Sequence, residues 1–253
     1  MPPRIPSQED LSPLPLHTTI QPPSPPESTT TLLLLLHGLG DSEAPFAAFA
    51  RSMSLPGVLC ISVRGPSVLP ASLLLGDPED GDAEGDGRGH YHWGDDIQLD
   101  SSTGEIDPDA GFARAEELLM EKLVRGVLVG ACGWDVGDVM VFGFGQGGSL
   151  ALGMGARLRG GDGRDSFKGI VSIGGPLPRS MLRGDGAAGE RTKSQTHVLV
   201  CQLSEEEEHL VKREFANVGV VRWKRGGVSM PRDRDEMFPL MKFFAERLRS
   251  GGW

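Results

Sequence analysis

The chain contains 253 residues with a formal net charge of −10, 36 glycines and 19 prolines. This length is typical of one α/β domain, and the glycine and proline content indicates that irregular segments accompany it. Because nucleic-acid-binding proteins cluster Lys and Arg against the phosphates, the acidic balance argues against that class of function.

Residues 1–29 contain nine prolines among Ser, Thr and Gln. Such a composition buries too little apolar surface to offset the entropy lost on ordering, so we predict a disordered tail. Its segment PPSPP (22–26) has the polyproline II character that SH3 and WW domains bind, although a plain linker is the simpler interpretation.

The tail has no apolar signal-peptide core, and the longest apolar run, Leu32–Leu36, is far shorter than a membrane span. We therefore expect a cytoplasmic protein without a transmembrane segment.

The pattern of an ordered domain begins at Thr30 and is expected to continue to residue 250. The run TTLLLLL (30–36) is too short for a buried helix and predicts a central strand that is buried on both faces. A helical stretch follows at 44–53, and a second buried strand, GVLCISV, follows at 57–63. The order of strand, helix and strand predicts a parallel sheet.

An acidic insert at 76–90 holds six acids and one Arg. We expect it to be a surface loop. Its residues Asp80, Asp82 and Glu84 resemble the first half of an EF-hand calcium loop. The twelfth position is Tyr91 instead of Glu, and no helix flanks the segment, so we expect no metal site.

The rest of the chain continues the alternation of helices and strands, with one further surface loop expected at 179–195. We predict a single doubly wound α/β domain, with a mostly parallel sheet, helices on both faces and no separate lid domain. The predicted helices span 108–129, a segment that starts near Gln146, and 237–248, and the predicted strands span 139–144, 167–175, 197–201 and 218–224.

Three cysteines, Cys60, Cys132 and Cys201, lie far apart in apolar surroundings without C-x-x-C spacing. Such positions are typical of buried free thiols in a reducing compartment. We expect neither a disulfide nor a cofactor.

The strongest local signal is VFGFGQGGSLALG (141–153), in which an apolar strand meets a glycine-rich turn and a helix of small residues. This is the setting of a nucleophile elbow, G-x-S-x-G, whose flanking glycines avoid collisions between strand and helix. Here Gly143, Gly145 and Gly147 occupy its three key positions. Glycine therefore stands where a catalytic serine would be expected.

The elbow resembles that of the acyl-protein thioesterases and carboxylesterases of the α/β-hydrolase superfamily, which reads G-F-S-Q-G-G where this chain reads G-F-G-Q-G-G (143–148). Three other segments, HGLGD (37–41), HWGDD (92–96) and GIVSIGGPLP (169–178), resemble family segments in the same order. The resemblance implies an α/β-hydrolase fold. It also implies that Leu39 and Gln146 supply the backbone donors of an oxyanion hole, and that the pocket lies near His37, Gly38, His92 and Trp93.

The same resemblance locates the other members of the catalytic triad. The family's acid corresponds to Glu206, although a run of four acids also suits a solvated helix start. The family's general base corresponds to Met230, six residues before Glu236, and none of the six histidines falls at that position. Both nucleophile and base are therefore absent from the positions that the family uses.

Two functions remain open at this stage. The chain is a catalytically degenerate hydrolase that acts by binding an acyl chain or an acylated protein, or it is an active ester or thioester hydrolase with a non-standard nucleophile. Cys201 and Ser149 are the candidates for such a nucleophile. We favour the first function, because loss of either nucleophile or base typically lowers the rate by several orders of magnitude.

Overall fold

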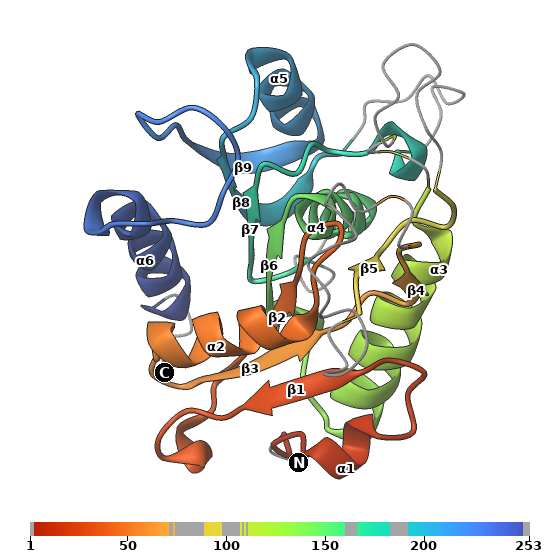
Figure 1. The fold of residues 1–253 in the computed structure, drawn as a ribbon. Helices are drawn as coiled ribbons and strands as arrows, with labels where there is room; N and C mark the ends of the chain where they lie inside the picture. The colour runs from red at the N-terminus through yellow and green to blue at the C-terminus, as the bar shows by residue number, and fades with distance from the viewer. Residues whose placement is uncertain are drawn as a thin grey trace, which may run out of the picture.

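The computed structural model describes residues 3–70, 73, 89–97, 107, 109, 111–159, 166–182 and 192–249. Its centre is a seven-stranded sheet in the order β1-β3-β2-β6-β7-β8-β9 (Figure 1). All neighbouring strands are parallel except β1 and β3. The strands are β1 (Thr18–Gln21), β2 (Thr31–Leu36), β3 (Val58–Val63), β6 (Val139–Phe144), β7 (Gly169–Ile173), β8 (Ser194–Cys201) and β9 (Phe215–Val221), and a separate antiparallel pair is formed by β4 (Ser67–Val68) and β5 (Tyr91–His92).

Helices cover both faces of this sheet, which confirms the predicted α/β architecture (Figure 1). One face packs against α2 (Glu43–Met53) and α6 (Arg234–Arg249). The other face packs against the remaining helices. These are α1 (Gln8–Leu11), α3 (Ala113–Glu116), which continues into the π-helix η3 (Glu117–Ala131), α4 (Gln146–Arg157) and α5 (Glu205–Glu214). The structure also contains three short 3-10 helices, η1 (Pro26–Ser28), η4 (Val136–Asp138) and η5 (Arg179–Met181).

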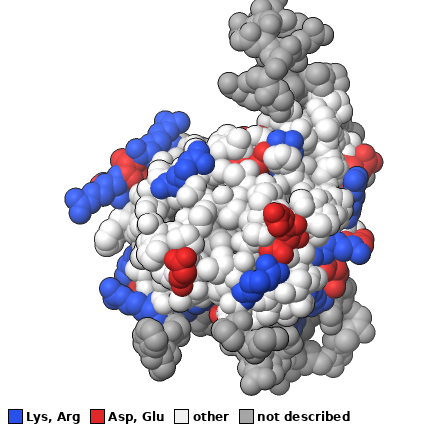
Figure 2. Space-filling view, turned by 90° about the horizontal axis from the view of Figure 1, so that it is seen from below, with Lys and Arg blue, Asp and Glu red and all other residues white. Residues whose placement is uncertain are grey.

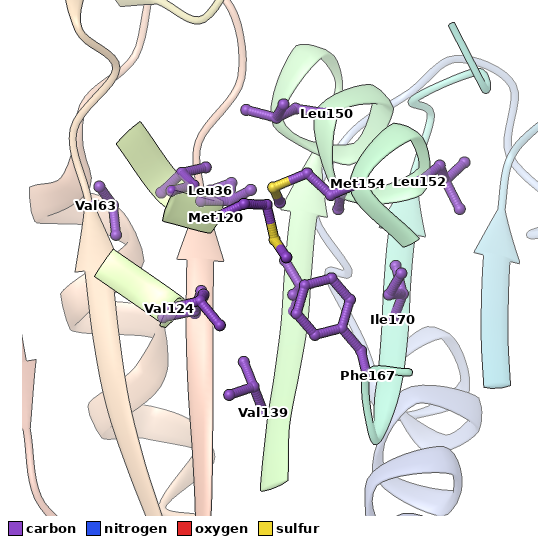
Figure 3. Close-up of a cluster of buried hydrophobic side chains, with 14 of the residues drawn as sticks. Leu36, Val63, Met120, Val124, Val139, Leu150, Leu152, Met154, Phe167 and Ile170 are labelled. Carbon is purple, nitrogen blue, oxygen red and sulfur yellow. The ribbon is translucent and has the colours of Figure 1, made fainter. Parts of the chain in front are cut away.

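The core consists of two apolar layers that the sheet separates. Every side chain of β2 is buried, because side chains that alternate between the faces enter one layer or the other. Figure 3 shows part of the layer beneath η3 and α4, where Met120 and Val124 of the helix approach Leu36, Val139 and Phe167. The uninterrupted leucine run is therefore explained by burial on both faces.

The prediction of a disordered tail at 1–29 is wrong for the part that the structure describes. β1 pairs antiparallel with β3, and Leu11 is fully buried in the core layer that includes η3. The indole Nε1 of Trp134 donates to the carbonyl of Arg4 at 2.8 Å. Composition misled the prediction, because a few leucines spaced among the prolines are sufficient to dock the segment on the sheet edge.

The helix predicted at 108–129 begins later and ends later, at 113–131. The carboxylate of Asp95 accepts hydrogen bonds from the backbone N–H groups of Ala113 (2.7 Å) and Arg114 (2.8 Å). This acceptor satisfies the first N–H groups of the helix and fixes its start. The cap comes from a residue 18 positions upstream, so the local sequence did not reveal it.

The two predicted surface loops fall mostly outside the described residues. Of the insert 76–90, only residues 89 and 90 are described, and of the loop 179–195, residues 183–191 are not described. The last residues of that predicted loop belong to β8, which starts at Ser194. On the face that Figure 2 shows, basic and acidic side chains are interspersed and do not form a basic patch. None of the described helices is long and apolar enough to span a membrane.

Candidate functional site

The glycine-rich turn forms a sharp corner between β6 and α4. Gly145 has φ 50° and ψ −121°, a conformation that strains residues with a Cβ. Its N–H donates to the carbonyl of Ile173 (2.9 Å), and its carbonyl accepts from the N–H of Ser149 (3.0 Å). The backbone therefore adopts the strained corner expected of a nucleophile elbow, with no side chain on it.

The flanking glycines are required for a different reason, which is close packing. A Cβ on Gly143 would lie 2.3 Å from the carbonyl oxygen of Gly147, and a Cβ on Gly147 would lie 2.5 Å from the carbonyl oxygen of His37. A Cβ on Gly145 would instead have a single neighbour within 4 Å, the Cα of Gly38 at 3.8 Å. The corner is thus sterically closed at 143 and 147 but open at 145, where a serine side chain has room.

A buried network fixes the loop that follows β2 against this corner. The imidazole Nε2 of His37 accepts from the N–H of Gly65 (2.8 Å), which leaves Nδ1 to donate to the carbonyl of Gly38 (2.7 Å). Burial lowers the pKa of His37, in agreement with this neutral form. The indole Nε1 of Trp93 donates to the carbonyl of His37 (2.8 Å), and the N–H of Trp93 donates to Oε1 of Gln146 (2.7 Å).

This network corrects the expectation that His37, Gly38, His92 and Trp93 line a pocket. His37 and Trp93 have no exposed surface, and His92 is 4% exposed. The rings of His37 and Trp93 lie inside the protein, because the hydrogen bonds that hold the loop draw them beneath it, whereas Nδ1 of the buried His92 has no hydrogen-bond partner among the described residues. His37 and Trp93 therefore support the loop beside the Gly145 corner from beneath.

The two predicted oxyanion donors flank the empty corner. Gln146 is the first residue of α4, so its N–H has no acceptor within the helix. Leu39 follows Gly38, whose Cα lies closest to the Cβ position of Gly145. The positive end of the α4 dipole is directed at the same place. Their role as donors to a ligand stays a prediction.

Glu206, at the position of the family's acid, is exposed to solvent. Its side chain is 84% exposed and makes an ion pair with Arg179 at 3.3 Å. It belongs to the first turn of α5, where the side chain of Ser204 caps the helix and Glu207 completes a capping box. The solvated helix start is therefore the interpretation that fits this carboxylate.

Met230, at the position of the base, is partly buried and packs its apolar side chain against the core layer beneath α2 and α6. Its carbonyl accepts a hydrogen bond from Arg225 (2.8 Å). No hydrogen bond in the described structure places a histidine on the Gly145 turn, and His209, the histidine nearest in sequence to the acid position, bonds its own helix backbone. The Met230 side chain has no group that can take up a proton, and the carboxylate of Glu206 is paired with Arg179.

The two alternative nucleophiles are both buried. Cys201 has no exposed surface, and burial raises the pKa of its thiol to about 12, so the reactive thiolate does not form near neutral pH. Ser149 is 1% exposed, and its hydroxyl lies 3.5 Å from the carbonyl of Gly145 within its own helix. Both side chains serve packing and local bonding.

Sequence reasoning missed the apolar rim of the site. Leu39 (39% exposed) and Val228 (48% exposed) are two of the four large apolar side chains that the described residues expose. Val228 packs on Gly174, since a Cβ there would lie 2.0 Å from the valine Cγ1. The adjoining Gly175 contacts the carbonyl of Gly145. Val228 lies only two residues from the predicted base position, yet no local pattern indicates that it points to the rim.

A cavity of about 230 Å³ lies between the segment that follows β7 and the start of α5. Its lining includes Pro176, the residue after Gly175, and combines apolar with charged side chains. Its lining residues are Asp109, Pro176, Leu177, Pro178, Arg179, Glu206, Glu207 and Leu210. The volume is below the range of about 300–1,000 Å³ for drug-sized ligands, so it suits a short apolar group.

Comparison with known proteins adds independent information. The sequence model of the phospholipase/carboxylesterase family matches residues 17–217. An uncharacterized hydrolase of Schizosaccharomyces pombe is 30% identical over 215 residues, which are 85% of this chain and 82% of the relative. The matched region includes the corner at Gly145.

Solved structures resemble the fold at low sequence identity. Acyl-protein thioesterase 2 of Zea mays gives a TM-score of 0.61 with 19% identity, covering 92% of this chain and 99% of that protein. A Bacillus cereus carboxylesterase gives a TM-score of 0.58 with 16% identity, covering 94% of this chain and 98% of that protein. The single-domain α/β-hydrolase fold extends over nearly the whole chain.

Proposed function

The chain belongs to the phospholipase/carboxylesterase family of α/β-hydrolases, and we propose that it is a member that binds an acyl group without hydrolysing it. The observation that carries the proposal is Gly145, which adopts the strained elbow conformation but has only empty space where a nucleophile would be. Without a nucleophile and a base at these positions, the covalent acyl-enzyme of the family's route has no means of formation.

The backbone of the site supports a binding role. The network of His37, Trp93 and Gln146 holds the loop after β2 against α4, so the two N–H donors remain oriented. Donors fixed in this way bind a carbonyl or carboxylate oxygen whether or not a reaction follows. The ligand would therefore place a polar oxygen beside Gly145.

The surroundings favour an acyl chain as the remainder of the ligand. Leu39 and Val228 flank the corner with exposed apolar surface, and the adjoining cavity has walls of Leu177, Pro178 and Leu210. Burial of such surface by a ligand is favourable at about 25 cal/mol per Å². An acyl chain, either free or attached to a protein, matches this arrangement.

The second candidate is an active hydrolase with a non-standard nucleophile. The relatives' names favour it, because the S. pombe relative is described as a hydrolase. The burial of Cys201 and Ser149 opposes it, since neither side chain reaches a bound ester. A single pair of assays separates the two candidates.

The purified full-length protein should be incubated with p-nitrophenyl butyrate and, separately, with a fluorophosphonate probe. We expect no turnover above buffer and no covalent label. Binding is measured in parallel by displacement of a fluorescent medium-chain fatty acid, which we expect to saturate. Labelling by the probe would overturn the loss of catalysis, and absence of fatty-acid binding would overturn the binding role.

A gain-of-function variant tests the geometry. Gly145→Ser combined with Met230→His restores the two missing family residues, and we expect esterase activity above that of either single variant. The single variants are the matched controls, because each lacks one partner. If the double variant bound the fluorescent acid but stayed inactive, the position assigned to the base would be wrong.

A further inference from the structure

The loop between β2 and α2 carries Leu39, the predicted backbone donor beside Gly145, and its middle pairs with β5. The N–H of Gly40 donates to the carbonyl of Tyr91 (2.9 Å), and the N–H of Tyr91 donates to the carbonyl of Asp41 (3.1 Å). Leu39 directly precedes this pair of hydrogen bonds. The position of Tyr91 therefore fixes the loop next to the predicted donor.

Arg64, the residue after β3, holds Tyr91 in turn. Its guanidinium lies over the Tyr91 ring, 4.7 Å from the centroid, and its Nη1 donates to the Tyr91 hydroxyl (3.3 Å). The same guanidinium donates to both carboxylate oxygens of Glu43, from Nε to Oε2 (2.6 Å) and from Nη2 to Oε1 (2.7 Å). Glu43 is the first residue of α2, where the loop ends. One side chain thus connects the middle of the loop with its end.

The backbone around Arg64 is fixed as well. The N–H of Arg64 donates to the carbonyl of His17, the residue before β1 (2.9 Å), and the imidazole of His17 lies 3.1 Å from Glu43. The N–H of the next residue, Gly65, donates to Nε2 of His37, where the loop begins (2.8 Å). Arg64 and Gly65 together therefore hold the loop at its beginning, middle and end.

The burial of this cluster favours a role in positioning. Glu43 is 3% exposed, and the side chain of Arg64 is 24% exposed. Desolvation offsets much of the attraction in a buried ion pair, so apolar residues of similar volume often stabilise a fold equally well. A two-point pair supplies a fixed geometry in addition. Lysine can pair with Glu43, but it cannot at the same time lie flat on Tyr91 and bond its hydroxyl.

We propose that Arg64 is a positioning residue of the acyl-binding site. Through Tyr91 and Glu43, it holds the N–H of Leu39 in place for the oxygen of the acyl group. This inference rests on the proposed function and adds a specific dependence to it. Affinity for the polar end of the ligand depends on a side chain that does not touch the ligand, whereas affinity for the apolar chain does not.

The first test uses the free full-length protein. Arg64→Lys keeps a charge opposite Glu43 but removes the two-point bond and the stacking on Tyr91. We expect amide hydrogen exchange in residues 38–42, measured by mass spectrometry, to become at least about tenfold faster, because this loop opens locally. Exchange in β7, which reports the stability of the whole sheet, should change less than about threefold.

The control for this test is Arg125→Lys, which makes the same change in the exposed pair with Glu121 and should alter neither rate. Loop exchange that stays at the wild-type rate in Arg64→Lys would overturn the proposal. Equal acceleration in the loop and in β7 would also overturn it, because Arg64 would then only stabilise the fold.

The second test separates the polar end of the ligand from its chain. Decanoate and 1-decanol share a chain, so the ratio of their affinities, measured by displacement of the fluorescent fatty acid, reports the polar end. Arg64→Lys and Tyr91→Ala should each lower this ratio about tenfold, because a hydrogen bond to a charged oxygen is stronger than one to a hydroxyl. Tyr91→Phe keeps the ring beneath Arg64 and should retain most of the ratio.

The two proposals fail in different ways. An unchanged ratio in both Arg64→Lys and Tyr91→Ala would overturn the positioning role while leaving acyl binding in place. A wild-type protein that binds neither decanoate nor 1-decanol would overturn acyl binding, and the exchange measurement would still decide whether Arg64 holds the loop.

Discussion

The guanidinium of Arg225 forms a two-point ion pair with the carboxylate of Glu236, with 2.6 Å between Nε and Oε1 and 3.0 Å between Nη2 and Oε2. Arg225 also lies over the ring of Trp223, 5.1 Å from its centroid, and Glu236 accepts from the N–H of Arg232 at 2.8 Å. The pair therefore closes the loop 225–236 at both ends. Val228 and Met230, the rim residue and the residue at the base position, lie inside this loop.

Glu236→Gln should loosen this loop, because it removes the charge that pairs with Arg225 while keeping the shape of the side chain. The ion pair lowers the pKa of Glu236, so the carboxylate is charged at pH 7 and its contribution is present there. We expect faster amide hydrogen exchange in residues 226–233, measured by mass spectrometry. Glu121→Gln, which breaks the exposed pair with Arg125, is the matched control and should leave this loop unchanged.

Gly145→Ser should fold, with a free energy of unfolding about 1–3 kcal/mol below that of wild type, because a side chain at φ 50° is strained but meets no atom. Urea denaturation measures this difference. Gly143→Ala should be far more damaging, because its Cβ would lie 2.3 Å from a carbonyl oxygen. Gly226→Ser, where nothing lies within 4 Å, is the control. If Gly143→Ala and Gly145→Ser lowered the free energy of unfolding equally, a side chain at 145 would be crowded and not merely strained.

Arg64→Ala should leave the buried carboxylate of Glu43 without its two-point partner, with only the imidazole of His17 remaining at 3.1 Å. Arg64 and Glu43 are joined at 2.6 and 2.7 Å, and Glu43 is 3% exposed. Burial opposes the charged form of Glu43, but the bonds to Arg64 outweigh it and the pKa is lowered. The stabilisation is thus present above the unfolded glutamate pKa of about 4.3 and is lost as the pH falls through the lowered folded pKa.

We therefore expect Arg64→Ala to lower the free energy of unfolding by about 3 kcal/mol at pH 7, and by progressively less below about pH 4. Urea denaturation at several pH values measures the difference from wild type. The double variant Glu43→Gln with Arg64→Ala has no carboxylate to titrate, so this pH dependence should disappear from it. A difference that is constant with pH would show that Arg64 acts through packing on Tyr91, whose ring centroid lies 4.7 Å away.

Leu11→Ala tests the ordered N-terminal segment. Leu11 is fully buried in the layer that contains η3, so truncation should lower the free energy of unfolding by about 2–5 kcal/mol. Thermal denaturation is a suitable measurement. Glu9→Ala, at an exposed position two residues earlier, should change little. A disordered tail would make the two variants indistinguishable.

The sequence by itself determined those features that short-range pattern specifies. The leucine run of β2 indicated a strand buried on both faces, because periodicity and length report burial directly. The spacing of Gly143, Gly145 and Gly147 located the corner between β6 and α4, since a sharp turn from strand to helix requires residues without a Cβ at such positions. The family also followed, because its motifs lie in contiguous segments.

Only the tertiary structure decided which side chains meet. Asp95 caps a helix 18 residues away, Arg225 pairs with Glu236 across a loop, and Leu11 reaches the core from a segment whose composition indicated disorder. It also placed His37 and Trp93 beneath the site instead of in its pocket, and Glu206 in solvent. These outcomes depend on contacts between segments distant in sequence, and the free energy of such contacts is set by packing and desolvation that no local pattern records.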